Sequence, residues 1–576
     1  MKLMWRYTMR NKRLLLLDFI CVFGFILIEL GLPTLLAKMI DVGVVNQDTD
    51  YIKRQGMLMI GITLIGITLN ILLGFFGAKL TTTIVRDIRD DLYEKIQTLS
   101  HQEYEDIGVS SLITRTTNDA YQIMLFMGII LRTGFMTPMM FLSSLYMVMR
   151  TSPSLSLAVI FSLPVLLIGV VIIAKFSDPL SVKQQKNLDR VNSILRENLS
   201  GLRVIRAFVN EKFEEERFDR VNKDYAESSK KLYKLMIAAQ PAFFFFFNVV
   251  MVLIIWFGSV QINNGTLQVG NLIAFIEYIF HALFSFMLFA SVFMMYPRAN
   301  VSAKRIQEVF DTEPTVKGNE EGQEETSTEG YLTFNNVTFA YPGHTESPVI
   351  RNVSFTASPG ETVAFIGSTG SGKSTLVQLI PRFFDVSKGE ILIDGVNVRD
   401  YSLAALRAKI GYIPQKALLF TGTIAENLRF GKEDATLEEM KKAAEIAQAA
   451  AFIEQKEKGF DEVLSEGGAN FSGGQKQRLA IARAIIRKPA IYIFDDSFSA
   501  LDFQTDAALR AALKKETTDA TVLIVAQRIS TIMHADKIIV LNEGNIVGIG
   551  THQELLKTSS VYYDIAASQL TEEELA

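Results

Sequence analysis

The chain has 576 residues, 58 basic and 62 acidic side chains, a net charge of −4 and a mean hydropathy of +0.22. Only 21% of its residues are charged, which is low for a soluble enzyme of this length, so we expect two or more domains, one of them in a membrane. The balanced charge gives no reason to propose nucleic acid as a partner, and the single cysteine, Cys21, excludes an intrachain disulfide.

The N-terminal segment, Met1 to Arg13, is basic and carries Trp5 and Tyr7 among its cations. This pattern is typical of a helix that lies on the inner membrane surface, and a frayed tail is the alternative. The apolar run that follows is too long for a signal peptide and has no evident small-residue cleavage site. We therefore interpret it as a retained membrane helix.

Six stretches in the first half of the chain are apolar enough to cross a membrane, which takes about 20 mostly apolar residues. They lie at about residues 14–37, 57–78, 122–149, 155–176, 237–260 and 271–296. The basic N-terminus is placed inside by the positive-inside rule, and the uncharged hairpin Gln261 to Gly270 suits the outside. Six spans then place both termini in the cytoplasm.

Two long polar segments, about residues 79–121 and 177–236, fall on the inner side and have helical patterns. We expect membrane helices to continue into the cytoplasm there and to be joined by short crosswise turns, one of them near Gly201 to Phe208. These tips either transmit motion between domains or are simply solvated helix pairs, and the sequence leaves both interpretations open.

Ionisable residues within a membrane span need a partner or a cavity. In the sixth candidate span, Glu277 and His281 are spaced i, i+4 and share one helix face. The spans are also rich in Phe and Met, and Phe284 and Met287 could contribute to an adaptable apolar pocket. A substrate cavity lined by these four residues is one interpretation; contacts between helices, or with lipid, are the other.

The chain becomes acidic and rich in Gly, Ser and Thr from Glu313 to Gly330, which predicts a flexible linker. Strand patterns begin at Tyr331 and alternate with helices, which predicts a parallel sheet with flanking helices. The predicted domains are thus an all-helical membrane domain at 1–312, a linker at 313–330 and an α/β domain at 331–576.

A phosphate-binding loop of the pattern G-x-x-x-x-G-K-[ST] stands at Gly367 to Ser374, without departure. The apolar run Thr362 to Ile366 predicts a buried strand before it, and Ser374 to Ile380 a helix after it. Such a loop directs backbone N–H groups at phosphate oxygens, and the helix N-terminus adds its positive dipole end. The residues expected to bind ATP in this stretch are Gly367, Ser368, Thr369, Gly370, Ser371, Gly372, Lys373, Ser374 and Thr375. Lys373 is expected to reach the β- and γ-phosphates, and Ser374 to bind Mg²⁺.

Further motifs follow in a fixed order: Tyr341, Gln415 after Tyr412-Ile413-Pro414, Ser472-Gly473-Gly474-Gln475, Asp495 at the end of an apolar run, and Ser499-Ala500-Leu501-Asp502. With them the chain resembles, over nearly its whole length, an ATP-binding cassette (ABC) exporter half-transporter. The resemblance implies a type I six-helix transmembrane domain fused to a cytosolic α/β P-loop nucleotide-binding domain. It also implies an integral protein of a bacterial cell membrane, in contact with lipid, that works as a pair of chains.

The resemblance assigns a role to each motif. Tyr341 would stack on adenine, and Gln415 would touch Mg²⁺ and sense the γ-phosphate. Asp495 would hold the Mg²⁺ shell together with Ser374. Ser472, Gly473, Gly474 and Gln475 are the family signature, which acts on ATP held by the partner chain. Ser499, Ala500, Leu501 and Asp502 form the D-loop.

Three positions depart from the family pattern. Phe471 stands where leucine is usual, just before the signature. Asp496 stands where a glutamate normally polarises the attacking water, and its carboxylate is one methylene shorter. Gln527 stands where a histidine is usual, and an amide can donate a hydrogen bond but cannot become cationic or relay a proton. Asp496 and Gln527 together predict a catalytic pair that hydrolyses ATP slowly.

The chain is therefore expected to be one half of a heterodimer that exports hydrophobic or amphipathic small molecules of the multidrug type. Its own phosphate loop would form the slow site, while its intact signature would complete an active site on the partner. The alternatives are a lipid or peptide exporter subunit, a regulatory protein gated by ATP, and a homodimer with two slow sites.

Overall fold

The computed structural model describes residues 1–319, 322–324, 329–343 and 346–571. The chain divides into two compact units, which we describe separately. The first comprises Met1–Gln97 and Ser110–Asp311, and the second comprises Thr98–Val109 and Thr312–Ala576. The short segment Thr98–Val109 thus groups with the C-terminal half of the chain, although it is flanked on both sides by membrane-unit sequence.

The first unit is entirely helical. Its elements are α1 (Lys2–Arg10), α2 (Lys12–Lys38), η1 (Met39–Val44), α3 (Thr49–Thr98), α5 (Val109–Thr114), η2 (Arg115–Asp119), α6 (Ala120–Ile129), η3 (Ile130–Gly134), α7 (Phe135–Thr151), α8 (Pro153–Ser200), α9 (Leu202–Ala207), α10 (Glu211–Asn263) and α11 (Val269–Asp311). Among the described residues, six helical segments are long and apolar enough to cross a membrane, which confirms the predicted number. They are Lys12–Val44, Thr49–Thr98, Val109–Thr151, Pro153–Ser200, Glu211–Asn263 and Val269–Phe289.

Helices α2, α7 and α11 pack together around a shared apolar core that includes Val22, Ile26 and Leu283. Two hydrogen bonds join η1 to the N-terminus of α11. The Asp41 carboxylate accepts hydrogen bonds from the backbone N–H groups of Gly270 and Asn271, at 2.6 and 3.1 Å, and thereby satisfies N–H groups at the α11 N-terminus that have no partner within the helix.

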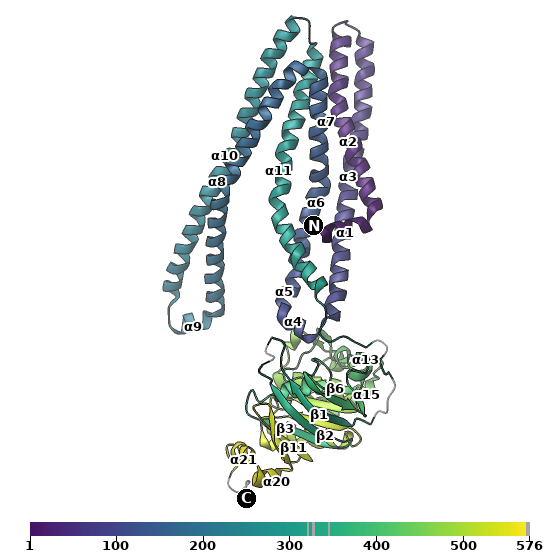
Figure 1. The fold of residues 1–576 in the computed structure, drawn as a ribbon, viewed down its shortest axis with the longest axis vertical. Helices are drawn as coiled ribbons and strands as arrows, with labels where there is room; N and C mark the ends of the chain where they lie inside the picture. The colour runs from purple at the N-terminus through teal and green to yellow at the C-terminus, as the bar shows by residue number, and fades with distance from the viewer. Residues whose placement is uncertain (320–321, 325–328, 344–345, 572–576) are drawn as a thin grey trace. The chain divides into compact units, whose positions relative to one another are not determined.

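Helices α8 and α10 form a long antiparallel hairpin, and the short α9 lies at its tip (Figure 1). They pack mainly against each other, with few contacts to α7 and α11. The structure thus shows the predicted pair of long helices joined by a short crosswise turn. At this tip the side chains of Phe208 and Val209 are 75% and 80% exposed.

The second unit contains a six-stranded sheet of order β12-β11-β3-β10-β9-β6. Its strands are β3 (Thr362–Gly367), β6 (Ile410–Ile413), β9 (Ile491–Asp495), β10 (Thr521–Val525), β11 (Lys537–Asn542) and β12 (Asn545–Gly550). All neighbouring pairs are parallel except β11 with β12. The predicted parallel sheet is therefore present, and the carboxyl ends of β3, β9 and β10 meet at one edge.

A second, antiparallel sheet of order β2-β1-β4-β5 was not predicted. It contains β1 (Leu332–Phe339), β2 (Ile350–Ala357), β4 (Lys388–Ile393) and β5 (Val396–Asn397), and a small pair is formed by β7 (Gly422–Thr423) and β8 (Val463–Leu464). The helices of this unit are α4 (His101–Ile107), α12 (Lys373–Gln378), α13 (Leu403–Ala408), α14 (Ile424–Arg429), α15 (Leu437–Ile446), α16 (Ala450–Glu454), η4 (Gly459–Asp461), η5 (Glu466–Gly468), α17 (Gly473–Ile485), α18 (Phe503–Glu516), α19 (Ile529–Ile532), α20 (His552–Thr558) and α21 (Ser560–Ala567).

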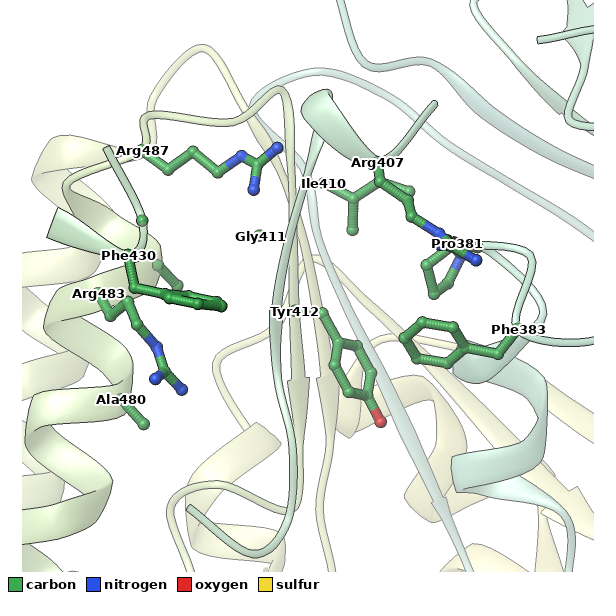
Figure 2. A pocket seen from close by; sticks show the side chains of 12 residues that line it. Pro381, Phe383, Arg407, Ile410, Gly411, Tyr412, Phe430, Ala480, Arg483 and Arg487 are labelled. Atoms are coloured by element: carbon green, nitrogen blue, oxygen red, sulfur yellow. Dashed lines mark hydrogen bonds between the residues drawn. The ribbon is translucent and has the colours of Figure 1, made fainter. Parts of the chain in front are cut away.

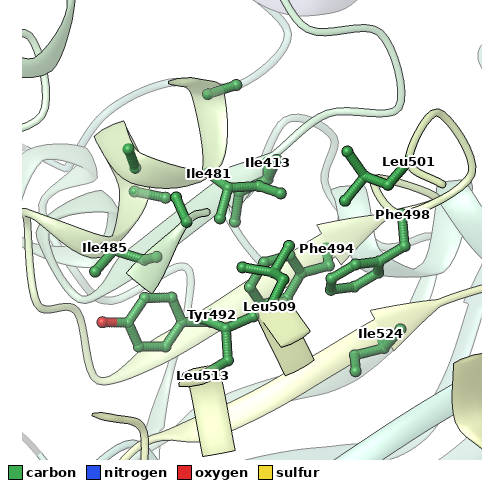
Figure 3. Packing of buried hydrophobic residues seen from close by; sticks show 14 of the residues in the cluster. Ile413, Ile481, Ile485, Tyr492, Phe494, Phe498, Leu501, Leu509, Leu513 and Ile524 are labelled. Atoms are coloured by element: carbon green, nitrogen blue, oxygen red, sulfur yellow. The ribbon is translucent and has the colours of Figure 1, made fainter. Parts of the chain in front are cut away.

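The parallel sheet is buried on both faces, which explains the continuous apolar runs in its sequence. On β9, Tyr492 and Phe494 belong to one core cluster, seen in Figure 3, while Ile491 and Ile493 belong to the cluster on the other face. All five residues of β9 are buried, including Asp495 at its carboxyl end. Packing on both faces of β9 therefore fixes the position of the Asp495 carboxylate.

The start of the predicted linker is held in place by the segment that contains α4. Glu103 accepts hydrogen bonds from the backbone N–H groups of Ser100 and Thr315, at 2.7 and 3.0 Å, and the Ser100 hydroxyl accepts one from Val316 N–H at 3.0 Å. Later in the linker, Gln323 N–H donates to the Asp400 carbonyl at 3.0 Å. Linker residues 320–321 and 325–328 lie outside the described residues.

Candidate functional site

The loop between β3 and α12 has the backbone geometry of a phosphate cradle. Gly370 and Gly372 have φ angles of +83° and +95°, which favour glycine. A Cβ atom on Gly367 would lie 2.1 Å from the Leu541 carbonyl oxygen, so only glycine fits there. The predicted helix after the loop is present as α12, which begins at Lys373, one residue before the predicted start at Ser374, and ends at Gln378 rather than at Ile380.

The Lys373 side chain curls back over this loop. Its Nζ donates hydrogen bonds to the carbonyl oxygens of Gly367 and Ser368, at 2.9 and 2.8 Å. Burial lowers the pKa of the Lys373 ammonium, and the nearby carboxylates of Asp496 and Asp495 act in the opposite direction. A cation held at this loop is suited to bind anionic phosphate oxygens.

A cavity of about 300 Å³ opens at this loop. Its lining brings together residues from motifs that are far apart in the sequence: Val349, Thr369, Gly370, Gly372, Lys373, Ser374, Thr375, Gln415, Asp496, Val525 and Gln527. The predicted adenine-stacking residue, Tyr341, lies beside it, and its hydroxyl is 3.0 Å from the Thr375 hydroxyl. Residues of the phosphate loop, Gln415 and the pair Asp496 and Gln527 therefore lie together around one cavity.

Oxygen ligands suited to Mg²⁺ stand at one side of the cavity. The Ser374 hydroxyl donates to Asp495 Oδ1 at 2.7 Å, and the Tyr412 hydroxyl donates to Asp495 Oδ2 at 3.1 Å. In the described part of the chain there is no group of three or more His, Cys, Asp or Glu side chains that could hold a metal alone. One hydroxyl and one carboxylate fit Mg²⁺, which binds few protein groups and takes its other ligands from phosphate and water.

Asp496 lines the cavity together with Gln415 and Gln527. Its Oδ2 atom accepts hydrogen bonds from two side-chain amides, Gln415 Nε2 at 2.9 Å and Gln527 Nε2 at 2.8 Å. Its backbone has a φ angle of +49°, unusual for a residue other than glycine. Burial raises the pKa of the Asp496 carboxyl above its usual value, although the two amide hydrogen bonds oppose this.

The signature residues form the N-terminus of α17. The Ser472 hydroxyl accepts a hydrogen bond from Gln475 N–H at 3.3 Å, while Gln475 Oε1 accepts one from Ser472 N–H at 3.0 Å, which makes a capping box. Ser472 and Gly473 are exposed, and the four signature residues Ser472, Gly473, Gly474 and Gln475 are not among those that line the cavity of their own chain. They are thus available to a ligand from outside this chain.

Phe471, where the family pattern has leucine, is a core residue. It is 5% exposed, its ring lies 6.3 Å from that of Phe452, and Lys456 Nζ stands 4.8 Å above it. The larger side chain is accommodated by packing and leaves the helix N-terminus intact.

The D-loop residues lie between Asp496 and α17, the helix that begins with the signature. The Ser499 hydroxyl donates to the Asp496 carbonyl at 2.9 Å, and Asp502 caps α18 by accepting from Thr505 N–H at 2.9 Å. Leu501 is buried, whereas Ala500 is exposed, and its carbonyl lies 3.2 Å from where a Cβ on Gly474 would be.

A second hollow of about 240 Å³ lies elsewhere on this unit (Figure 2). Phe383 and Tyr412 stand next to each other at its edge, with ring centroids 5.4 Å apart. Neither Phe383 nor the hydroxyl contact between Tyr412 and Asp495 was predicted as part of a site, because no local motif marks them. The only sequence signal was the position of Tyr412 three residues before Gln415.

The predicted substrate-cavity residues lie on α11. Glu277 is exposed, while His281, Phe284 and Met287 are partly buried. His281 is close enough to Glu277, and to Glu29 of α2, to interact with their charges. The ring of Phe284 stacks on that of Phe280 with centroids 5.5 Å apart. The structure thus places His281 near two acidic side chains, and Phe284 against a second aromatic ring of α11.

Comparisons with known proteins agree with this arrangement. Residues 15–287 match the family described as "ABC transporter transmembrane region", and residues 350–499 match the family described as "ABC transporter". The chain is 39% identical over 548 residues to an uncharacterised ABC transporter ATP-binding protein of Mycobacterium tuberculosis, covering 94% of each chain. It is equally similar, at 39% identity, to the uncharacterised protein YfiB of Bacillus subtilis, covering 95% of this chain and 94% of that protein.

A relative in Staphylococcus aureus has a name that assigns it, provisionally, to multidrug export, and it is 32% identical over 554 residues, or 94% of this chain and 96% of its own length. Among solved structures, a bacterial Atm1-family ABC exporter with ATP bound superposes with a TM-score of 0.81, over 97% of this chain and 99% of that chain. Its 23% identity supports a common fold and no more.

Proposed function

The chain belongs to the ABC transporter family, and from that premise we propose that it is the slowly hydrolysing half of a heterodimeric exporter of hydrophobic and amphipathic small molecules. It is an integral membrane protein and an ATP-hydrolysing transporter with the fold of an ABC exporter. The asymmetry, the partner and the substrate class are the parts that we propose.

The observation that carries the proposal is the double hydrogen bond on Asp496. A catalytic base must reach the attacking water in the correct geometry, and small displacements cost orders of magnitude in rate. The Asp496 carboxylate is one methylene shorter than glutamate, and one of its oxygens already accepts two amide N–H groups. The water would therefore be poorly oriented, and Gln527 cannot compensate because an amide carries no titratable proton.

Nucleotide binding would remain strong at the same site. Lys373 and the loop N–H groups would hold the phosphates, Tyr341 would stack on adenine, and Ser374, Asp495 and Gln415 would hold Mg²⁺. When bound, Mg²⁺ neutralises charge on the β- and γ-phosphate oxygens. This chain's site would thus retain ATP through several turnovers of the partner's site.

Two features support a second half-transporter chain as the partner. The signature at the α17 N-terminus is intact and faces outward, so it suits ATP held by another chain. The α8–α10 hairpin leaves exposed apolar side chains at its cytoplasmic tip, namely Leu199, Phe208, Val209 and Phe213. A partner chain would cover both surfaces.

The transport cycle that we propose runs from ATP binding to substrate release. ATP held between the phosphate loop of one chain and the signature of the other would close the two nucleotide-binding domains. The helical tips would carry this closure to the membrane helices, which would open outward, and hydrolysis at the partner's site would reset the pair. Both termini would lie in the cytoplasm of a bacterial cell.

The substrate class rests on the composition of the membrane helices. Phe247, Phe280 and Phe284 form successive ring contacts of 5.7 and 5.5 Å near His281 and Glu277. Apolar rings beside one or two polar groups suit amphipathic molecules. The name of the Staphylococcus aureus relative points to the same class.

Export can be tested in inverted membrane vesicles that contain this chain and its partner. We expect ATP to drive accumulation of a hydrophobic fluorescent dye, and Lys373→Ala to reduce it. Accumulation that is the same without ATP would contradict the pump, and transport of labelled phospholipid in place of dye would favour a lipid exporter.

The asymmetry can be tested by purifying the chain alone and with the partner. We expect little ATPase activity from the chain alone and full activity from the pair. Full activity from the chain alone would refute the slow site, and mass measurement of the native complex distinguishes a heterodimer from a homodimer.

A further inference from the structure

A row of aromatic rings leads from the edge of the nucleotide cavity to α4, entirely within the second unit. Tyr341, beside the cavity, meets Phe384 edge to face, with ring centroids 5.3 Å apart at 87°. Phe384 in turn meets His101, the first residue of α4, at 5.5 Å and 83°. Two contacts thus connect the residue placed against adenine with a helix that precedes it by more than two hundred positions.

A second row starts at the metal side of the cavity and ends at the same residue. The Tyr412 hydroxyl donates to Asp495 Oδ2 at 3.1 Å, and the Tyr412 ring lies edge to face with Phe383 at 5.4 Å and 88° (Figure 2). Phe383 lies 6.1 Å from His101. Because Phe383 and Phe384 are neighbours in the chain, both rows meet at the imidazole of His101.

The position of His101 is not explained by burial. Its side chain is 48% exposed, and its Nε2 atom lies 3.4 Å from the Glu105 carboxylate on the next turn of α4. The helix itself is anchored, because Ser100 and Glu103 hold the backbone of Thr315 and Val316, where the chain enters the second unit. An exposed imidazole in contact with two phenyl rings at the anchored end of a helix is suited to transmit displacement rather than to fill a core.

We propose that His101 is a positioning residue through which the nucleotide site controls α4. A base stacked on Tyr341, or a metal held at Asp495, would shift Tyr341 or Tyr412, and the ring contacts would pass the shift to His101. Such contacts are directional and close-packed, so a displaced ring moves its neighbour. The chain continues from α4 into α3 on one side and α5 on the other, so movement of α4 reaches two membrane helices. The inference rests on the proposed function, since it assigns the ATP site a route to the membrane.

The experiment uses the full chain, assembled with its partner, in lipid nanodiscs. A Cys21→Ala background removes the only native thiol, and Asp106→Cys places a reporter at an exposed position of α4. The maleimide labelling rate of this thiol is measured with and without ATP and Mg²⁺, and ATP affinity is measured in parallel with a fluorescent analogue. We expect nucleotide to change the labelling rate, and His101→Ala to reduce that change by about two- to tenfold, the range expected from loss of ring contacts. ATP affinity should change by less than about twofold, because His101 does not line the cavity.

Matched variants distinguish ring contact from general damage. His101→Phe keeps a ring and should retain the response, and Phe384→Tyr should retain more of it than Phe384→Leu. Tyr563→Ala, which removes an exposed ring on α21, should have no effect. An undiminished response in His101→Ala would overturn this inference alone. A tenfold loss of ATP affinity in His101→Ala would also overturn it, since the residue would then belong to the binding site. Failure of the unsubstituted complex to bind ATP would overturn the proposed function as well.

Discussion

The two ends of the nucleotide cavity differ in how closely they follow the family pattern. The phosphate loop, Gly367 to Ser374, has every residue that the pattern requires and the backbone geometry to match. At the opposite end, Asp496 and Gln527 replace the usual glutamate and histidine, yet they are joined by a hydrogen bond of 2.8 Å. Under the proposed function, this difference means that ATP is held and cleaved by separate residues, so that cleavage would weaken while the frame of β3, β9 and β10 is kept.

The largest effect is expected on ATP affinity, from a substitution in the phosphate loop. Lys373→Ala removes the cation that lies over the loop, and we expect ATP affinity of this chain to fall about 100-fold, as for loss of a charge-assisted contact with phosphate. Lys441→Ala, on an exposed face of α15, is the matched control and should have no effect. Fluorescent-nucleotide titration measures both, and equal affinities would contradict the assignment of Lys373.

The role of Asp496 and Gln527 can be tested by replacing them with the glutamate and histidine that are usual in the family. Asp496→Glu with Gln527→His should raise the ATP turnover of this chain's own site by about 10- to 100-fold, because the base then reaches the water and the second group can relay a proton. Single-turnover ATPase assays are needed, with the partner's site inactivated so that only this site is counted. Asp519→Glu, the same change in an exposed loop, is the control. Unchanged turnover in the double variant would refute the slow site.

The signature offers a smaller test that separates the two sites of the pair. Ser472→Ala removes the cap of α17 and a phosphate ligand, and we expect turnover of the assembled complex to fall about tenfold. ATP affinity at this chain's own loop should not change. Thr436→Ala removes an equivalent capping box at the N-terminus of α15 and controls for the lost cap. A fall in turnover of the same size in both variants would show that the effect is structural.

The smallest effect is expected on the melting temperature, from a change at Glu103, which holds the start of the linker. Burial alone would raise the pKa of the Glu103 carboxyl, but hydrogen bonds from Thr315 and Ser100 outweigh it and hold the pKa below its usual value. Glu103 therefore contributes stability that is complete above the unfolded pKa of about 4.5 and is lost as the pH falls through the lower, folded value. The melting temperature of wild type should exceed that of Glu103→Gln at pH 7, and the gap should close on acidification.

Glu433→Gln, at an exposed site, serves as the control in the same melting experiment. A gap between wild type and Glu103→Gln that stays constant from neutral to acidic pH would show that the carboxylate charge has no part in holding the linker.

Features encoded by contiguous residues were predictable from the sequence. The membrane helices followed from long apolar runs, and the phosphate loop followed from eight adjacent residues flanked by a strand and a helix. The motifs at Gln415, Asp495 and Gln527 could be placed near it through the resemblance to the ABC exporter family, whose motifs they match in order.

Features that depend on pairing between distant residues were not predictable. The antiparallel sheet needs β1 to find β4, with Leu332 opposite Ile393, and no turn signal links them. The grouping of α4 with the second unit depends on Glu103 meeting Thr315. The convergence of Gln415 and Gln527 on one oxygen of Asp496 requires side-chain geometry that a motif does not record.

The self-contained packing of α8 against α10 has a consequence for the cell. Under the proposed pairing and orientation, a copy synthesised in excess of its partner would present the uncovered tip around Phe208 and Val209 to the cytosol. Quality-control proteases act on such orphan surfaces, so the abundance of one chain would set how much of the other survives. Matched expression of the two genes would then be a requirement of the architecture itself.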